Sequence, residues 1–314
     1  MKPPVVLKVR PSRELLVALS GLHPESPFCT PEYVQSRAQL GETPVLLGRM
    51  NGEGLQSGSV GYVSRTGLVR TLEVPSLDAL ADQAGWVALL KHARRRLVAI
   101  VDLNTHASRA GKIPSFPWPT TRRNRVEHIM DLQQPVHLSS QHGRAVKKAA
   151  AAGARMVRVS VADAAVLHQR LVNASMSRRM ARGEAVGHVE AALEARALLA
   201  AGAGELVQVT VAGEALSSIL ILRSARSAYY HSAGTNPAGM EVGASPFLIS
   251  ACAQMLAAEG RSTFNLGDAT EENPGLLRFK RGFGGYAVPL DAATVELWPF
   301  ARMMNRVPAL IAAS

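Results

Sequence analysis

The segment at residues 275–285, GLLRFKRGFGG, constrains this chain more than any other stretch of its sequence. It places three basic residues, two aromatic residues and four glycines in eleven positions. Because glycine has no Cβ, such a strand or turn lets the backbone come close to another part of the molecule. Lys280 follows Phe279, a position from which an ammonium group on a buried stem can point into a cleft. The alternative interpretation is a solvated, bulged hairpin.

The charge of the chain favours an anionic partner. Its 314 residues include 35 Lys and Arg against 24 Asp and Glu, which gives a formal net charge of +11. A basic excess of this size favours nucleic acid, a phosphorylated substrate or cofactor, or an anionic membrane surface, and composition does not choose among them. The length indicates two domains of ordinary size.

Cysteine content and hydropathy indicate the compartment. The two cysteines, Cys29 and Cys252, lie far apart in the sequence, which excludes a disulfide scaffold and fits a reducing environment. The N-terminus has no signal-peptide core, and no window approaches the ~20 apolar residues of a membrane span. We therefore expect a cytoplasmic protein without a transmembrane segment.

Periodicity and turn signals predict a mixture of helices and strands. Helices are expected at 12–19, from Thr30 onward, and at 77–96, 139–153, 164–176, 187–201 and 247–259. Strands are expected at 43–49, 60–63, 67–74, 97–102, 126–132, 156–161, 206–211, 214–222, 228–233 and 263–268. The first half shows a thinner version of the order in the second half. We therefore predict two related α/β (α+β) domains in tandem, at 1–133 and 134–314.

Residues 104–125 are predicted to be an irregular, basic loop without an acidic residue. Phe116 and Trp118 stand between prolines, and the arginines include Arg122. A loop of this kind suits binding of a phosphate or a planar group. A solvated connection with Trp118 in a core is the alternative.

Several familiar catalytic motifs are absent from the sequence. It contains no nucleophile elbow, Walker lysine loop, His-Glu-x-x-His or Rossmann glycine motif, and its nine histidines lack ligand spacing, so no metal is expected. What remains is a predicted helix N-terminus near Gly243, whose N–H groups would bind an anion, and Lys280, which would stabilise an oxyanion or hold a carboxylate or phosphate. Such an arrangement suits acyl transfer to an amine, which needs an oxyanion stabiliser, a place for a phosphate-rich donor and a route for proton loss.

Four segments resemble the GNAT superfamily and, within it, the Fem-type aminoacyltransferases and their acyltransferase relatives. They lie at 26–33, 140–153, 260–267 and 275–285. The last is similar to the closing motif Gly-Leu-x-x-Phe-Lys-x-x-Phe-Gly-Gly of that family. The resemblance implies two GNAT-like domains, the first degenerate and the second catalytic, each with a mixed, mostly antiparallel sheet flanked by helices.

The sequence also departs from the Fem pattern. It has no counterpart of the coiled-coil insertion, Gly143 stands where a basic residue is common, and Tyr33 replaces the usual Trp. These departures bear on the peptidoglycan-precursor substrate more than on the fold.

The resemblance implies transfer of an acyl or aminoacyl group to a primary amine, with Lys280 at the reacting carbonyl. The expected catalytic residues are Lys280, Asp268 and Phe279. Donor or anion binding is expected at Gly243, Ala244, Ser245, Arg278 and Arg281. Acceptor binding is expected at Tyr230, His231, Glu271, Trp118 and Arg122.

The donor is expected to be a co-substrate and not a tightly bound cofactor. The high charge favours aminoacyl-tRNA, because phosphate contacts dominate nucleic-acid affinity. The missing coiled coil favours acyl-CoA, which is our expectation, with an amine of a small molecule or a cell-envelope precursor as acceptor.

Two readings from other classes stay open. A non-catalytic nucleic-acid-binding protein would use the arginine clusters at 122–125 and 178–182, although an aromatic content of 5% leaves few stacking platforms. The segment 298–306 would alternatively dock on an anionic membrane surface, whereas packing on its own domain is the competing interpretation.

Overall fold

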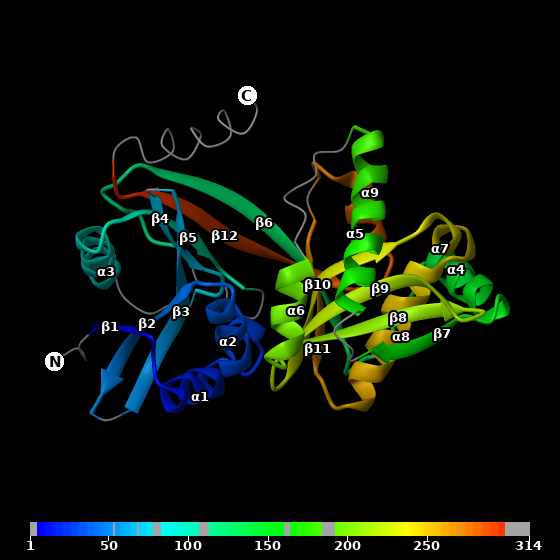
Figure 1. Ribbon diagram of the computed structural model, residues 1–314, viewed down its shortest axis with the longest axis horizontal. Coiled ribbons are helices and arrows are strands. Elements are labelled where there is room, and N and C mark those ends of the chain that lie inside the picture. Colours follow the sequence, from blue (N-terminus) through cyan, green and yellow to red (C-terminus); the bar gives the residue numbers. More distant parts are fainter. Residues whose placement is uncertain are drawn as a thin grey trace. The chain divides into compact units, whose positions relative to one another are not determined.

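The chain forms two compact units, drawn in Figure 1. The computed structural model describes residues 5–52, 54–67, 69–77, 83–106, 113–159, 164–183, 192–269 and 271–298. The first unit comprises 1–125 and 289–314, and the second comprises 126–288. The division differs from the predicted 1–133 and 134–314 because the end of β12 (Tyr286–Glu296) pairs antiparallel with β5 (Val98–Asn104).

The first unit is built on a sheet whose strands follow the order β1-β2-β3-β4-β5-β12. Neighbouring strands are antiparallel except β4 and β5, which are parallel. The remaining elements are β1 (Val5–Val9), β2 (Thr43–Asn51), β3 (Gly54–Thr66), β4 (Val69–Val74), α1 (Arg13–Leu22), η1 (Pro27–Cys29), α2 (Pro31–Gln39) and α3 (Gln83–Arg95).

Local sequence signals fix several elements of the first unit. The Thr30 hydroxyl accepts the N–H of Tyr33 at 3.2 Å, and Pro31 occupies the first position of α2. Asn51-Gly52 turns β2 into β3, with Gly52 at a φ of 58°. Trp86 of α3 packs with Val101 and other apolar residues of the sheet.

The second unit has a sheet in the order β6-β11-β10-β9-β8-β7. Only β10 and β11 are parallel among the neighbouring pairs described. The elements are β6 (Thr120–Asp131), α4 (Ser140–Ala151), β7 (Arg155–Val159), α5 (Ala164–Ala181), α6 (Ala192–Ala200), β8 (Gly204–Val211), β9 (Glu214–Arg223), β10 (Ser227–Thr235), α7 (Pro237–Val242), α8 (Ala244–Ala258), β11 (Thr263–Asp268) and α9 (Pro274–Arg281). Each unit thus has the expected mixed, mostly antiparallel sheet flanked by helices.

The two faces of the second sheet are covered by different helices. Ile219 and Ile221 of β9 pack with Leu248 of α8 in one apolar core. The residue before Ile219, Ser218, points to the other face and bonds His168 of α5. This alternation follows from the period of two along a strand, and it places α5 and α8 on opposite faces (Figure 1).

Three sequence predictions of secondary structure are wrong. The glycine-dense segment was expected as a strand, turn or hairpin, but residues up to Arg281 form α9, because Pro274 occupies its first position and Leu277 and Lys280 bury one face. The basic stretch at 177–181 continues α5 and does not separate two helices, because no Gly or Pro interrupts it before Gly183. Part of the expected loop at 104–125 is strand, since β6 begins at Thr120.

Candidate functional site

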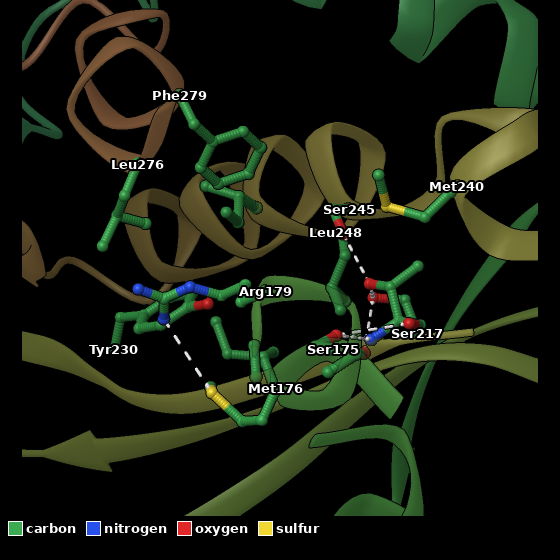
Figure 2. A pocket seen from close by; sticks show the side chains of 15 residues that line it. Ser175, Met176, Arg179, Ser217, Tyr230, Met240, Ser245, Leu248, Leu276 and Phe279 are labelled. Carbon is green, nitrogen blue, oxygen red and sulfur yellow. Dashed lines mark hydrogen bonds between the residues drawn. The ribbon is translucent and has the colours of Figure 1, made fainter. Parts of the chain in front are cut away.

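The second unit contains a cavity of about 150 Å³ beside β10, shown in Figure 2. Parallel pairing of β10 with β11 ends at Tyr229 and Asn265. The cavity is lined by the part of β10 that follows, together with residues of α5, β9, α7, α8 and α9. Space outside the carboxyl end of such strands is where ligands enter open α/β sheets.

One wall of the cavity is apolar. Leu276 and Phe279 point into it from α9, and Met176 and Leu248 contribute from α5 and α8 (Figure 2). Arg179 also lines the cavity, whereas none of the described residues that line it is Asp or Glu. The cavity therefore suits an uncharged or anionic ligand with an apolar group.

A chain of hydroxyl groups forms another wall. The Thr235 hydroxyl lies 2.8 Å from that of Ser217 and 2.5 Å from that of Ser245. The Ser175 hydroxyl accepts the N–H of Thr235 at 2.9 Å. These bonds join the end of β10 to β9, α5 and the first turn of α8, so the wall is fixed from three sides.

The helix N-terminus expected near Gly243 is present as the start of α8. Gly243 has a φ of 82°, and a Cβ there would lie 2.7 Å from the Ala145 oxygen, so both conformation and close packing require glycine. No side chain caps the helix, so N–H groups of its first turn are open to a ligand. Pro246, in that turn, has no N–H to contribute. Of the three donor-binding residues predicted at this helix start, Ser245 lines the cavity and Ala244 is buried in the core.

Lys280 is buried, with 6% of its surface exposed. Its ammonium group donates to the Asp268 carbonyl oxygen at 2.7 Å and lies 5.9 Å from the centre of the Tyr230 ring. Tyr230 lines the cavity, and so does Phe279, the neighbour of Lys280 on α9. The predicted catalytic pair Phe279 and Lys280 thus lies at the cavity wall, with the cation behind the Tyr230 ring.

Asp268 supports this arrangement through its backbone. Its carboxylate accepts the N–H of Val126 at 3.1 Å, while its carbonyl holds Lys280. Next to it, Gly267 has a φ of 76°, and a Cβ there would lie 3.5 Å from the Lys280 ammonium.

Tyr230 keeps its proton at neutral pH. Burial raises the pKa of Tyr230 to about 12, and the positive charge of Arg179 acts in the opposite direction. A neutral phenol in a cavity wall can donate a hydrogen bond or a proton to a developing anion.

Gly282, Gly284 and Gly285 permit close approach, as predicted for segment 275–285, whereas Gly275 has no such neighbour. A Cβ on Gly282 would lie 2.7 Å from ring atoms of His142, and one on Gly285 would lie 2.6 Å from the Ile129 oxygen. The His142 ring also bonds the Phe279 carbonyl at 2.9 Å, so α4 holds the end of α9.

Other predicted site residues in this unit lie apart from the cavity. His231, at a bulge of β10, faces Glu194 of α6 at 3.5 Å. Arg281 and Glu271 form an exposed ion pair at 3.5 Å, and Arg278 is exposed as well.

Trp118 and Arg122 belong to the first unit. Trp118 packs against the core there, as the alternative interpretation had it. Arg122 donates to the carbonyl oxygens of Ile113 and Pro114, each at 2.8 Å. The other predicted cations of this region, Arg109 and Lys112, lie outside the described residues.

Sequence reasoning missed two groups near the site. Arg178 and Arg179 were considered only as a nucleic-acid cluster, yet Arg179 lines the cavity and Arg178 donates to the Thr235 carbonyl at 2.5 Å. Burial, with the nearby Arg182, lowers the pKa of Arg178. Their spacing along one helix was the available signal.

The second missed group is a buried amide–carboxylate pair. Asn265 donates to Glu127 at 2.7 Å and accepts the N–H of Gly267 at 2.8 Å. Glu127 is 1% exposed. No local pattern joins residues so distant in sequence, so only the fold reveals this support for the turn beside Lys280.

The described ranges hold no candidate metal site and no candidate membrane-spanning helix. Within them no cluster of His, Cys, Asp and Glu is placed to hold a metal ion. No helix among them is long and apolar enough to cross a membrane.

Comparison with known proteins agrees with the second unit's architecture. Residues 138–281 match the family model of the acetyltransferase (GNAT) domain. No curated protein matches the chain.

Solved structures extend the likeness over nearly the whole chain. FemX superposes with a TM-score of 0.67 at 10% identity, covering 90% of this chain and 96% of FemX. L-PGS from Bacillus licheniformis gives 0.54 at 12%, covering 81% and 86%. A tandem GNAT protein from the clavulanic acid biosynthesis pathway gives 0.51 at 11%, covering 94% and 99%. The fold is that of the GNAT superfamily, as the four sequence segments indicated.

Proposed function

We propose that this chain, which has the fold of the GNAT superfamily, is an N-acyltransferase that moves an acyl group from a thioester donor to a primary amine. The observation that carries the proposal is the cavity beside β10. It combines an apolar wall for an acyl group with the neutral phenol of Tyr230 and the buried ammonium of Lys280. We place the reaction in the second unit and treat the first as a degenerate copy.

The reaction forms an amide and breaks a thioester. The amine nitrogen attacks the carbonyl carbon, the carbonyl oxygen gains negative charge, and the C–S bond then breaks to release a thiolate. A cation near the developing oxyanion lowers the barrier to the first step. We assign that role to Lys280, whose ammonium lies over the Tyr230 ring, 5.9 Å from its centre.

Tyr230 is our candidate for the proton donor. Burial raises its pKa to about 12, so the phenol is protonated at neutral pH and can donate a hydrogen bond to the sulfur as the C–S bond breaks. The proton lost by the amine ends on the departing sulfur: the phenol passes its own proton to the thiolate and takes up the amine's proton in exchange, so the transfer is balanced.

The lining of the cavity favours an acyl over an aminoacyl donor. An aminoacyl group carries an ammonium, which needs an acidic partner when it is removed from water. Among the described residues of its lining the cavity offers Arg179 and no carboxylate, so it disfavours that charge. We therefore propose acyl-CoA, with the α5 arginines and the start of α8 receiving its phosphates.

Aminoacyl-tRNA is the second candidate donor. The observation in its favour is the group Arg178, Arg179 and Arg182 near the end of α5, together with the net charge of +11. This donor would require a different seat for the aminoacyl ammonium.

Donor binding is the first test. The melting temperature is measured with acetyl-CoA, a longer acyl-CoA, free CoA, and charged or uncharged tRNA, at low and moderate salt. A rise with acyl-CoA that persists at moderate salt supports the proposal, because a ligand of the folded state raises its stability. A rise with charged tRNA alone would move the protein to the aminoacyl reaction.

Turnover is the second test. Thiol release from the best acyl-CoA is followed with a panel of small amines and amino sugars. We expect Lys280→Met and Tyr230→Phe each to lower kcat by a factor of about 10² or more while both proteins stay folded. Lys148→Met, on the exposed face of α4, is the matched control. Unchanged turnover in Lys280→Met rules out the proposed mechanism.

A further inference from the structure

The first unit contains a cavity of its own, which takes no part in the proposed reaction. It has a volume of about 240 Å³ and lies between α3 and residues of β1 to β5. Ligand sites that enclose a drug-sized molecule measure ~300–1,000 Å³, so this cavity is large enough for a single chain or small ring.

The floor of this cavity is apolar. Val45, Leu72 and Val98 are buried there, and Ala93 of α3 closes the other side. Binding of an apolar group over this floor is favourable, by roughly 25 cal/mol for each Å² of apolar surface removed from water.

Two arginines stand among these apolar residues. Arg70 donates to the Arg96 carbonyl at 3.1 Å, which holds the two residues side by side. Within the described part of the chain neither forms an ion pair, and both side chains are exposed. Both line the cavity, so their remaining N–H groups are available to an anion.

A histidine lines this site and further cations lie beside it. The Nε2 atom of His92 is buried and has no hydrogen-bond partner among the described residues, although the residue lines the cavity. Lys91, Arg94 and Arg95 on α3 are exposed next to it in sequence. A buried polar atom without a partner is costly, and a ligand oxygen would satisfy it.

Apolar side chains are also exposed close to these cations. Val9, which lines the cavity, is 46% exposed, and Leu97, next to Arg96, is 64% exposed. Leu97 has a φ of 62°, a conformation that costs about 1–2 kcal/mol for a residue with a Cβ. The combination of apolar surface and arginines matches a molecule that has both an apolar chain and a negative charge.

We propose that this cavity binds an anionic amphiphile, an apolar chain that ends in a carboxylate or a phosphate. The apolar chain of the ligand occupies the space over Val45, Leu72 and Val98, and its anionic head accepts hydrogen bonds from Arg70 and Arg96. The planar guanidinium groups suit such a head because each can donate two parallel hydrogen bonds to it.

The test titrates the full chain by calorimetry with dodecanoate, dodecyl phosphate and dodecanol, each below its aggregation limit. We expect saturable binding of the two anions, at least tenfold tighter than that of the alcohol. The double variant Arg70→Gln/Arg96→Gln should lose at least tenfold in affinity for the anions. Arg155→Gln is the matched control, because Arg155 is an exposed arginine of β7 in the second unit, away from this cavity.

A second variant tests the apolar part of the site. Ala93→Phe fills the cavity and should abolish binding of the ligand's apolar chain. Tryptophan fluorescence checks that the variant is folded, since Trp86 packs in the same core. Vesicles with and without phosphatidylglycerol separate the sources: cosedimentation with anionic vesicles indicates a bilayer lipid, and binding of the soluble anions alone indicates a free one.

Three results would overturn the proposal. They are the absence of saturable binding, equal affinity for dodecanol, and unchanged affinity in the arginine or Ala93 variants. Lys280→Met should leave the affinity unchanged, so the outcome is independent of the proposed acyl transfer.

Discussion

Replacing Gly282 by alanine tests how tightly α9 is held against α4. Gly282 ends α9 with a φ of −63°, which any residue adopts, so alanine costs nothing in backbone conformation. A Cβ there would lie 2.7 Å from both Cε1 and Nε2 of His142. The effect of the substitution is therefore a steric one.

His142 has little room to move away. Its ring is 6% exposed, bonds the Phe279 carbonyl at 2.9 Å, and lies edge-on to Phe283 with ring centres 4.4 Å apart. Displacing the ring loses one hydrogen bond, about 1 kcal/mol, and an aromatic contact of about 0.5–1.5 kcal/mol. We expect Gly282→Ala to lower the free energy of unfolding by about 2 kcal/mol, within the usual range for an overpacked core.

Urea unfolding followed by circular dichroism measures this change, since Trp86, Trp118 and Trp298 all lie in the first unit and do not report on it directly. Gly275→Ala is the matched control, because a Cβ at that position of α9 meets no atom within 4 Å. The control should be as stable as the parent or slightly more so. Adding His142→Ala to Gly282→Ala removes the clash, so the double variant should lose at least 1 kcal/mol less than the two single losses together. Equal losses in Gly282→Ala and Gly275→Ala, or strict additivity, would refute the reasoning.

Two further predictions concern stability. Burial, with the charge of His231 as a second cause, lowers the pKa of His168 from 6.5 to about 4. Because the unfolded chain takes up the proton first, the free energy of unfolding should fall by about 3 kcal/mol as the pH drops from 6.5 to 4. Urea titrations at each pH measure this loss, and His168→Gln should remove most of it. If the parent and His168→Gln show the same pH dependence, the buried neutral histidine is not its source. Gly267 and Gly260 have φ values of 76° and 77°, and a Cβ on either would meet no atom closer than 3.4 Å. The alanine variant of each should therefore lose a similar amount of unfolding free energy, about 1–2 kcal/mol, in thermal or urea unfolding. A much larger loss in Gly267→Ala would mean that the turn beside Lys280 is tighter than these distances indicate.

Much of the fold was predictable because its signals are local. Thr30 caps α2, Ser139 caps α4 through the N–H of His142, and the turn at Ala212-Gly213 has both residues at positive φ. Each of these features depends on residues within a few positions of one another. They are therefore legible in the sequence without knowledge of the packing.

The elements that escaped prediction depend on context. Pro274 and Gly275 are typical of a turn, but proline is also common at the first position of a helix. The segment forms α9 because Leu277 and Lys280 are buried on one of its faces. The length of β6 is likewise set by partners far along the chain, such as Asp268, which pairs with Glu127.

The candidate site was predicted only in part. Tyr230, Ser245 and Phe279 line the cavity, and Lys280 lies behind its wall. The hydroxyls of Ser217 and Thr235 were missed, because serine and threonine in strands carry no distinctive spacing. The boundary between the units also differs from the predicted one, since pairing of β12 with β5 returns the chain to the first unit.

The sequence by itself determined the helix caps, the turns, the two-unit α/β class and the likeness to the GNAT superfamily. The tertiary structure decided which side chains meet. Lys280 is buried against Tyr230 while its neighbour Arg281 is exposed, because successive residues of a helix point about 100° apart and only packing selects the buried face. Asn265 and Glu127 pair across 138 positions for the same reason: contacts between distant residues arise from how the strands and helices pack and not from any local pattern.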